Sequence, residues 1–164
     1  MRLYQLHTKQ KLPISIDQAW EFLSDPNNLE KITPDMGFEI LSGTDRPMFA
    51  GQIIQYIVSP FPGVKTKWVT EITHVKDKEF FVDEQRFGPY ALWHHKHFIK
   101  EIEGGVEMED IVDYKLPFGI LGRLLHTLVV KNKLKNIFEY REKRLIELFG
   151  DFEDQIKVIQ MKSI

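Results

Sequence analysis

Cysteine is absent from the 164 residues of this chain. Disulfides, thiolate metal sites and cysteine nucleophiles are therefore excluded. Long apolar runs are also scarce. The longest, from Leu116 to Val130, is interrupted by Arg123 and His126 and is shorter than the ~20 residues that a membrane-spanning helix needs. The amino-terminal sequence MRLYQLHTKQ is polar where a signal peptide needs an apolar run. We therefore expect no integral membrane segment and a cytoplasmic location.

An excess of positive charge is missing as well, because the formal net charge is -2 and the pI is near 6.3. Such a chain has no overall positive field for phosphate backbones, so nucleic acid is not an expected partner. The sequence shows no linker or internal repeat, and its length suits one domain. We expect a domain over residues 1–150 and a tail at 151–164 to which the sequence assigns no role. Whether the chain forms a homodimer is left open.

What the sequence does contain is a series of strand-length segments. Residues 3–12 have the length and the turn boundary of a strand, and Ser15-Ile16-Asp17-Gln18 resembles a capping box that starts a short helix. A second short helical turn is expected at 29–32. Segments rich in β-branched and aromatic residues then follow at 37–42, 51–59, 64–75, 79–87, 92–103 and 106–116. Their short separators predict hairpins, and so an antiparallel meander.

The hydrophobic period changes again near Phe118. From there to Phe149 apolar residues recur at helical spacing, and Gly150 is placed to end a long helix. Because no crossover helices separate the later strands, the predicted class is α+β. We predict a helix-grip fold, in which a curved seven-stranded antiparallel sheet surrounds the C-terminal helix and two short helices follow the first strand. The side chains expected to pack on the concave face are Leu125, Leu128, Phe138 and Leu145.

Five motifs carry a resemblance to a known superfamily. They are Gly88-Pro89-Tyr90, Trp93-His94-His95-Lys96-His97, Met108-Glu109-Asp110-Ile111-Val112-Asp113-Tyr114, Pro117-Phe118-Gly119-Ile120-Leu121-Gly122 and Ile137-Phe138-Glu139-Tyr140-Arg141. From about Leu3 to Gly150 the chain resembles the START-like, birch-pollen-allergen-like superfamily (SRPBCC; polyketide cyclase/dehydrase and lipid transport), and more narrowly its bacterial ligand-binding branch. The resemblance implies the helix-grip fold and a ligand cavity. It does not select an activity, since lipid carriers, hormone receptors and a few cyclases share this scaffold.

The last predicted hairpin gathers polar side chains on an apolar face. A two-residue turn at Gly104-Gly105 would pair Glu103 with Val106, which places Asp110 opposite Ile99 and diagonal to His97. His94 and Asp113 would then face solvent. The predicted ligand-binding residues are Trp93, His95, His97, Met108, Asp110, Val112 and Tyr114 on this face and Leu125, Leu128 and Arg141 on the helix.

The buried histidines and aspartate need partners, because an unpaired buried polar group costs about 1–3 kcal/mol. His97 and Asp110 form a structural pair in one interpretation and an acid–base catalyst in another. In a third, His95, His97 or Tyr114 orients the polar end of an apolar ligand. In a fourth, His95, His97 and Asp110 bind a metal. Arg141 either reaches into the cavity toward a carboxylate or lies in solvent with its stem over apolar surface.

From these features we expect binding or transport of a small hydrophobic molecule in a cavity between the sheet and the C-terminal helix. No catalytic residue, cofactor or metal is assigned. The alternative is a cyclase or dehydratase that uses the His97 and Asp110 pair, and a third class is a regulatory domain that docks another protein. A closed, mostly apolar cavity would favour binding, whereas an open pocket with His97 exposed to it would favour catalysis.

Overall fold

The structure, a computed structural model, describes residues 2–34, 37–61, 63–155 and 158–164. The first half holds β1 (Tyr4–Leu12), α1 (Ile16–Leu23), the 3-10 helix η1 (Pro26–Ile32), β2 (Glu39–Ser42), β3 (Gln52–Phe61) and β4 (Val64–Lys76). The second half holds β5 (Phe80–Phe87), β6 (Leu92–Ile102), β7 (Gly105–Lys115), α2 (Gly119–Leu125), the π-helical turn η2 (His126–Val130), α3 (Lys131–Phe149) and β8 (Val158–Ser163).

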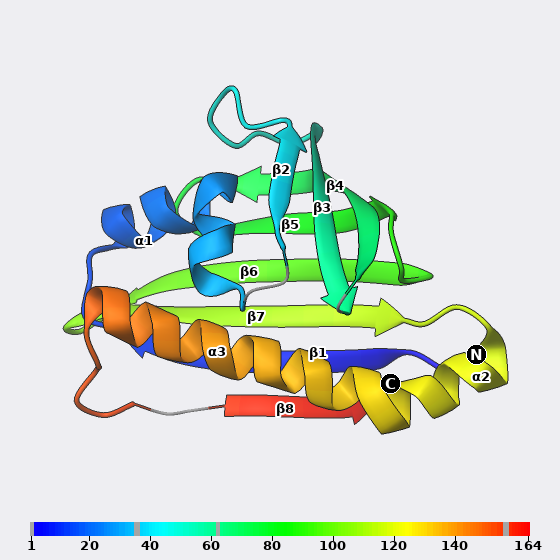
Figure 1. Ribbon diagram of the computed structural model, residues 1–164. Helices are drawn as coiled ribbons and strands as arrows, with labels where there is room; N and C mark the ends of the chain where they lie inside the picture. The colour runs from blue at the N-terminus through cyan, green and yellow to red at the C-terminus, as the bar shows by residue number, and fades with distance from the viewer. Residues whose placement is uncertain (1, 35–36, 62, 156–157) are drawn as a thin grey trace.

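The strands form one antiparallel sheet in the order β2-β3-β4-β5-β6-β7-β1-β8, and α3 lies along β1 and β8 (Figure 1). Two register shifts interrupt the β4–β5 pairing, one between Val69 and Thr70 and one between Ile72 and His74. Such bulges bend strands and increase their twist. In Figure 1, β2 and β3 accordingly run across the direction of β6 and β7. The predicted α+β helix-grip architecture is confirmed.

The sheet has one strand more than the seven predicted. β8 pairs with β1 from Lys9 opposite Val158 to Tyr4 opposite Ser163. Residues 151–164 therefore include an edge strand of the same sheet, although the sequence assigned them no role. The pairing could not be read locally, because the strand returns to the sheet only after the whole of α3.

The turn between β6 and β7 lies one residue earlier than predicted, which shifts the strand pairing by two residues. It consists of Glu103 and Gly104, with Ile102 opposite Gly105, so Gly105 belongs to β7. Gly104 has a φ of 81°, which favours glycine, and a Cβ on Gly105 would lie 2.1 Å from the carbonyl oxygen of Leu12. The predicted pairing of Glu103 with Val106 is wrong. The predicted faces are nevertheless correct, because a shift of two residues leaves every side chain on its original side.

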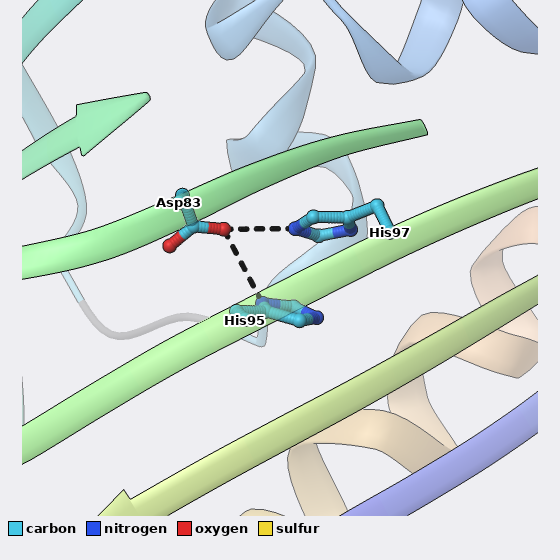
Figure 2. A group of neighbouring side chains, drawn as sticks. All are labelled: Asp83, His95 and His97. Carbon is cyan, nitrogen blue, oxygen red and sulfur yellow. Dashed lines mark hydrogen bonds and ion pairs between the residues drawn. The ribbon is translucent and has the colours of Figure 1, made fainter. Parts of the chain in front are cut away.

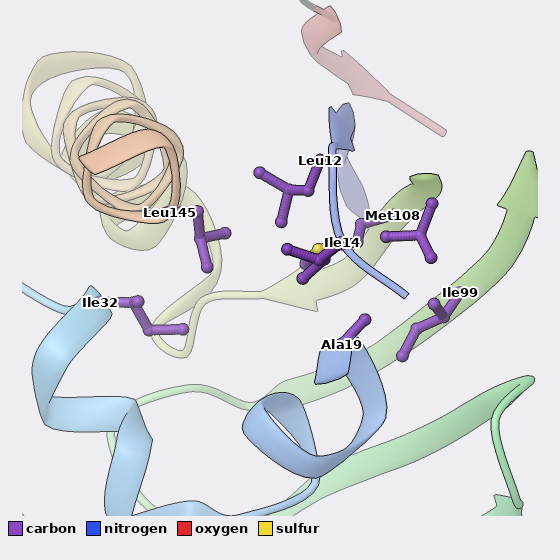
Figure 3. Packing of buried hydrophobic residues seen from close by; sticks show 8 residues of the cluster. Leu12, Ile14, Ala19, Ile32, Ile99, Met108 and Leu145 are labelled. Atoms are coloured by element: carbon purple, nitrogen blue, oxygen red, sulfur yellow. The ribbon is translucent and has the colours of Figure 1, made fainter. Parts of the chain in front are cut away.

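The short helices follow their sequence signals. Ser15 and Gln18 form the expected capping box at the start of α1: Ser15 Oγ accepts from Gln18 N at 3.2 Å, and Gln18 Oε1 accepts from Ser15 N at 3.1 Å. Asp25 caps η1 by accepting from Asn27 N at 2.9 Å. These elements close one end of the interior. They contribute to a core cluster with Leu145 and the inner faces of β1, β6 and β7 (Figure 3). The cluster contains Leu12, Ile14, Ala19, Ile32, Ile99, Val106, Met108 and Leu145.

The long C-terminal helix is buried along only part of its length. In α3 the buried side chains are Leu134, Phe138, Arg141 and Leu145. Leu125 and Leu128, which we predicted to pack on the sheet, are 47% and 65% exposed. Leu125 ends α2, which lies beyond the end of β7 (Figure 1), and Leu128 follows it in η2. Within the described ranges, no helix combines the length and the apolar composition that crossing a bilayer requires.

Candidate functional site

The inner face of β5, β6 and β7 holds a buried group of ionisable side chains. His95, His97 and Asp110 are 7%, 8% and 7% exposed. Strand alternation places the two histidines on the same side of β6, and the register sets His97 directly opposite Asp110 of β7. The imidazole centroids of His95 and His97 lie 3.7 Å apart, and the Phe81 ring stacks on His97 at 4.1 Å. We call Asp83, His95, His97, Asp110 and Arg141 the polar cluster.

Asp110 is the central acceptor of the polar cluster. Its Oδ1 is hydrogen-bonded to Nε2 of His95 at 3.1 Å and lies 2.8 Å from Nδ1 of His97. The contact with His97 does not have the geometry of a hydrogen bond. Its Oδ2 accepts a 3.4 Å hydrogen bond from the hydroxyl of Thr8. The guanidinium of Arg141 reaches from α3 to within 3.6 Å of Oδ1. The aspartate thus joins β1, β6, β7 and the helix at one point.

Asp83 is a member of the cluster that the sequence analysis missed. It stands on β5 opposite His95. Its Oδ2 lies 2.8 Å from Nε2 of His97 and 3.5 Å from Nδ1 of His95 (Figure 2). Alternation along Phe81, Val82 and Asp83 was a usable signal, since it would place Phe81 and Asp83 on one face. The β5–β6 register across the Gly88-Pro89-Tyr90 loop was not predictable from the sequence.

The charges in the cluster are strongly coupled. Burial lowers the pKa of His95, and the neighbouring His97 lowers it further. Burial also acts to lower the pKa of His97, but hydrogen bonding and charge from Asp110 and Asp83 outweigh it, and the pKa of His97 is raised. The two carboxylates therefore favour the protonated, charged form of His97, whereas burial and the charge of His97 favour the neutral form of His95.

The two carboxylates remain ionised despite their burial. Burial acts to raise the pKa of Asp110, but Arg141 and the two imidazoles hold that pKa well below its ordinary value. The pKa of Asp83 is likewise lowered, against burial, chiefly by its hydrogen bond with His97. Buried carboxylates stay charged only where cations and hydrogen bonds compensate the lost hydration. Arg141 and a protonated His97 provide that compensation.

Arg141 is buried, at 8% exposure, rather than in solvent. Its spacing from Leu134, Phe138 and Leu145 already placed it on the buried stripe of α3. Beyond the contact with Asp110, its guanidinium lies 5.9 Å from the Phe138 ring centroid. Its Nε is buried and has no hydrogen-bond partner. One donor of this arginine is therefore available to a bound group.

Aromatic rings cover the neighbouring part of the inner face. Trp93 lies 5.5 Å from Trp68 and 4.8 Å from Tyr90, and Tyr90 meets Tyr114 edge-on at 6.0 Å. Tyr56 stacks on Trp68 at 6.0 Å. Of these rings only Tyr114 is fully buried, and the others keep partial exposure. Trp93 and Tyr114 were predicted from the sequence, whereas Tyr56, Trp68 and Tyr90 were not. The contact of Trp68 with Trp93 depends on the curvature that brings β3 and β4 toward β6.

The far end of the site is closed by a histidine that the sequence analysis did not assign. Nε2 of His126 lies 2.8 Å from the hydroxyl of Tyr114, and its ring stacks on Tyr4 at 3.5 Å. His126 is 6% exposed, although most of its apolar neighbours in α2 and η2 face solvent. This histidine is thus the buried anchor of η2 on the sheet.

A small cavity lies between α3 and the β7–β1–β8 part of the sheet. Its volume of about 20 Å³ is enough for roughly one water molecule. Asp110 and Arg141 line it together with Met108 and Phe138, and β8 contributes Val158 and Ile159. His97 is not among its lining residues. The wall is thus mixed, because the polar residues Thr8, Lys9, Gln10 and Glu142 also line it.

No protein-family model matches the sequence, and no curated protein matches it. Solved structures do. Protein CV1439 from Chromobacterium violaceum superposes with a TM-score of 0.67 at 15% identity, over 93% of this chain and 100% of that one. A START superfamily protein from Mycobacterium smegmatis gives 0.66 at 13% identity, over 88% and 99%. Ara h 8.0201 gives 0.59 at 13% identity, over 88% and 99%. The chain has the START-like, birch-pollen-allergen-like fold.

The START-like fold brings most of the predicted site residues together. His95, His97, Asp110 and Arg141 meet in the polar cluster, and Met108 lines the adjacent cavity. Trp93, Val112 and Tyr114 lie on the same inner face. Leu125 and Leu128 do not join them, since both are exposed beyond the sheet. Identities of this size establish the fold alone, so function is argued from the site.

Proposed function

We propose that this START-like domain binds a small hydrophobic molecule between the sheet and α3 and holds its polar end at Arg141. The observation that carries the proposal is the buried Nε of Arg141, which has no hydrogen-bond partner beside a cavity lined by Met108, Phe138 and Ile159. A buried donor without an acceptor costs about 1–3 kcal/mol. An acceptor supplied by a ligand removes that cost.

The same contacts indicate the polarity of the ligand. Asp110 contacts His95, His97 and Thr8 as well as Arg141. Its ion pair with Arg141 leaves the guanidinium Nε without a hydrogen-bond partner. A guanidinium presents a planar set of donors that suits a carboxylate or another acceptor pair. The rest of the cavity wall combines apolar side chains with polar ones, namely Met108, Phe138, Val158 and Ile159 with Thr8, Lys9, Gln10 and Glu142. We therefore favour a ligand with an apolar chain or ring system and one anionic or hydrogen-bond-accepting end.

A ligand of this kind needs more space than the structure shows. Small-molecule pockets usually measure about 300–1,000 Å³, so binding requires the interior to open. The segment best suited to move is 118–125, where Ile120, Leu121 and Leu124 are 75%, 72% and 57% exposed. Phe118 enters it with a φ of 65°, which is uncommon for a residue with a side chain. Few packing contacts and a strained entry are features of segments that open locally.

Catalysis by His97 and Asp110 is the weaker alternative. A general base must reach the group whose proton it takes, within a hydrogen bond or one water. His97 does not line the cavity, and both of its ring nitrogens face carboxylates of the cluster. Its protonated state is favoured by those carboxylates, which suits an ion pair better than a base. Binding without chemistry therefore accounts for the arrangement with fewer assumptions.

The direct test is native mass spectrometry of protein purified without detergent. We expect a co-purifying molecule, or binding of single-chain carboxylates added as probes and detected by a change in tryptophan emission from Trp68 and Trp93. Arg141→Met should abolish binding of the carboxylate probes while the protein stays folded by circular dichroism. The matched control is Arg144→Met, which changes an arginine one turn along α3 that pairs with Glu147 at the surface.

Two results would contradict the proposal. One is a wild-type protein that neither carries a molecule nor responds to the carboxylate series. The other is probe binding that survives Arg141→Met at full strength, because the anchoring donor would then lie elsewhere.

A further inference from the structure

We propose that Asp83, His95 and His97 form a binding site for a divalent transition metal on the inner face of β5 and β6. Each side chain offers one ligand atom, and these three atoms lie within 4.8 Å of one another (Figure 2). Asp83 was absent from the metal-binding set weighed from the sequence, which consisted of His95, His97 and Asp110. The arrival of Asp83 from β5 changes the chemistry available to the two histidines.

The distances suit a metal at the centre of the three atoms. Metal–ligand bonds of about 2.0–2.1 Å in a tetrahedral site place adjacent ligand atoms about 3.3 Å apart. Oδ2 of Asp83 lies 2.8 Å from Nε2 of His97 and 3.5 Å from Nδ1 of His95. These separations bracket the tetrahedral value. The third separation, between the two imidazole nitrogens, is no more than 4.8 Å.

Asp110 provides a second, independent feature of a metal site. It faces the opposite nitrogen of each ring, Nε2 of His95 and Nδ1 of His97. Histidines that bind a metal usually donate their other N–H to a carboxylate or a carbonyl, which fixes the tautomer and the ring orientation. Here one carboxylate, held by Arg141 and Thr8, is hydrogen-bonded to Nε2 of His95 at 3.1 Å and lies 2.8 Å from Nδ1 of His97 without hydrogen-bond geometry. The two histidines thus lie between Asp83, which would bind the metal with them, and Asp110, which contacts their other ring nitrogens.

Burial and charge also favour a cation at this position. The side chains of Asp83, His95 and His97 are 15%, 8% and 10% exposed. Two buried carboxylates face one arginine, so the cluster needs a further positive charge, which either a proton or a metal ion provides. A set of two imidazoles and one carboxylate suits Zn²⁺, Fe²⁺ or Mn²⁺ rather than Ca²⁺ or Mg²⁺, which prefer oxygen ligands alone. Three protein ligands leave at least one coordination position for water or for a polar group.

The first test uses Co²⁺ as a spectroscopic probe with the full-length protein above neutral pH. We expect one Co²⁺ per chain with visible absorption bands, which require direct coordination, and displacement of those bands by Zn²⁺. X-ray absorption of the zinc form should show two imidazole nitrogens and oxygen in the first coordination sphere. Both measurements use the wild-type protein, so they do not depend on whether any variant folds.

Variants then assign the ligands. Asp83→Asn and His97→Gln should each weaken Co²⁺ binding by at least about 100-fold, and Asp110→Asn by about 10–100-fold, since it removes only the outer support. The control is His94→Gln on the same strand, because His94 points to the other face and contacts Glu84. That variant should bind Co²⁺ as the wild type does.

Several outcomes would overturn the metal site. They are no Co²⁺ or Zn²⁺ retained by the wild-type protein after dialysis, a zinc coordination sphere made of oxygen alone, or equal binding by wild-type and Asp83→Asn protein. None of these results bears on carboxylate binding at Arg141, because that test needs no metal. The two proposals therefore fail separately.

Discussion

Asp110 lies directly opposite His97 across the β6–β7 ladder, with its Oδ1 2.8 Å from the imidazole Nδ1. The same carboxylate contacts His95, Arg141 and Thr8 from three other directions. A buried residue with four polar neighbours affects the stability of all of them, because its removal leaves several charges or hydrogen-bonding groups without compensation.

The first prediction compares the two aspartates of β7. Asp110→Ala should lower the free energy of unfolding by roughly 3–5 kcal/mol, because it leaves buried cationic groups unpaired. Asp113→Ala should cost about 1 kcal/mol or less, since its partners Lys96 and Gln5 lie on the outer face and can turn to water. Urea unfolding of both variants measures the difference. Equal losses would mean that the polar cluster is not buried as described.

A second prediction concerns the two parts of the C-terminal helix. Leu145→Ala should cost about 2–5 kcal/mol, because Leu145 is 1% exposed in the core cluster. Leu128→Ala should change stability by only about 0.5 kcal/mol, as expected for an exposed side chain. Thermal unfolding monitored by circular dichroism separates the two cases. A large cost at Leu128 would show that this side chain is buried in solution.

A third prediction tests β8 as a part of the domain. Ile159 and Met161 pack against the cluster that contains Leu6 and Tyr114, whereas Gln160 between them faces solvent. Deletion of residues 151–164 should destabilise the protein by at least ~2 kcal/mol through the lost apolar burial. It should also promote self-association, since β1 becomes an unpaired sheet edge. Chemical unfolding and light scattering report the two effects.

Point variants provide the control for the deletion. Ile159→Ala and Met161→Ala should each weaken the fold in the same direction, and Gln160→Ala should leave it unchanged. If the deletion variant is as stable and as monomeric as the intact chain, β8 does not contribute to the sheet.

A fourth prediction concerns pH and the anchor of η2. Burial lowers the pKa of His126, and Lys131 and Arg2 lower it further; Tyr4 and Tyr114 are its other close neighbours. With a pKa below the unfolded value of about 6.5, the neutral ring favours folding above that pH. This contribution is lost as the pH falls from about 6.5 through the lowered pKa of the folded protein.

Amide exchange within 126–130 is the appropriate measurement, because His97 titrates in the opposite sense. The raised pKa of His97 stabilises the fold at low pH, so global unfolding combines both effects. We expect protection factors in 126–130 to fall on acidification in the wild type and to be pH-independent in His126→Phe. Protection that rises on acidification in the wild type would contradict the assignment of His126 as a neutral anchor.

Much of the architecture follows from the local sequence. The strands and the long helix lie within a few residues of the predicted segments, because alternation and helical spacing each bury one face. The inner face of β6 and β7 was predicted correctly even though the pairing register was wrong by two residues, since a shift of two leaves each side chain on its original face. Arg141 also followed the helical spacing of its buried neighbours.

Tertiary structure decided which of those side chains meet. Asp83 reaches His95 and His97 only through the β5–β6 register. Trp68, with Tyr56 stacked on it, reaches Trp93 only because the sheet curves. Leu125 and Leu128 have a helical apolar pattern, yet both are exposed, whereas His126 between them is buried against Tyr4 and Tyr114. Periodicity states which face of an element is apolar, whereas burial depends on what lies opposite that face in space.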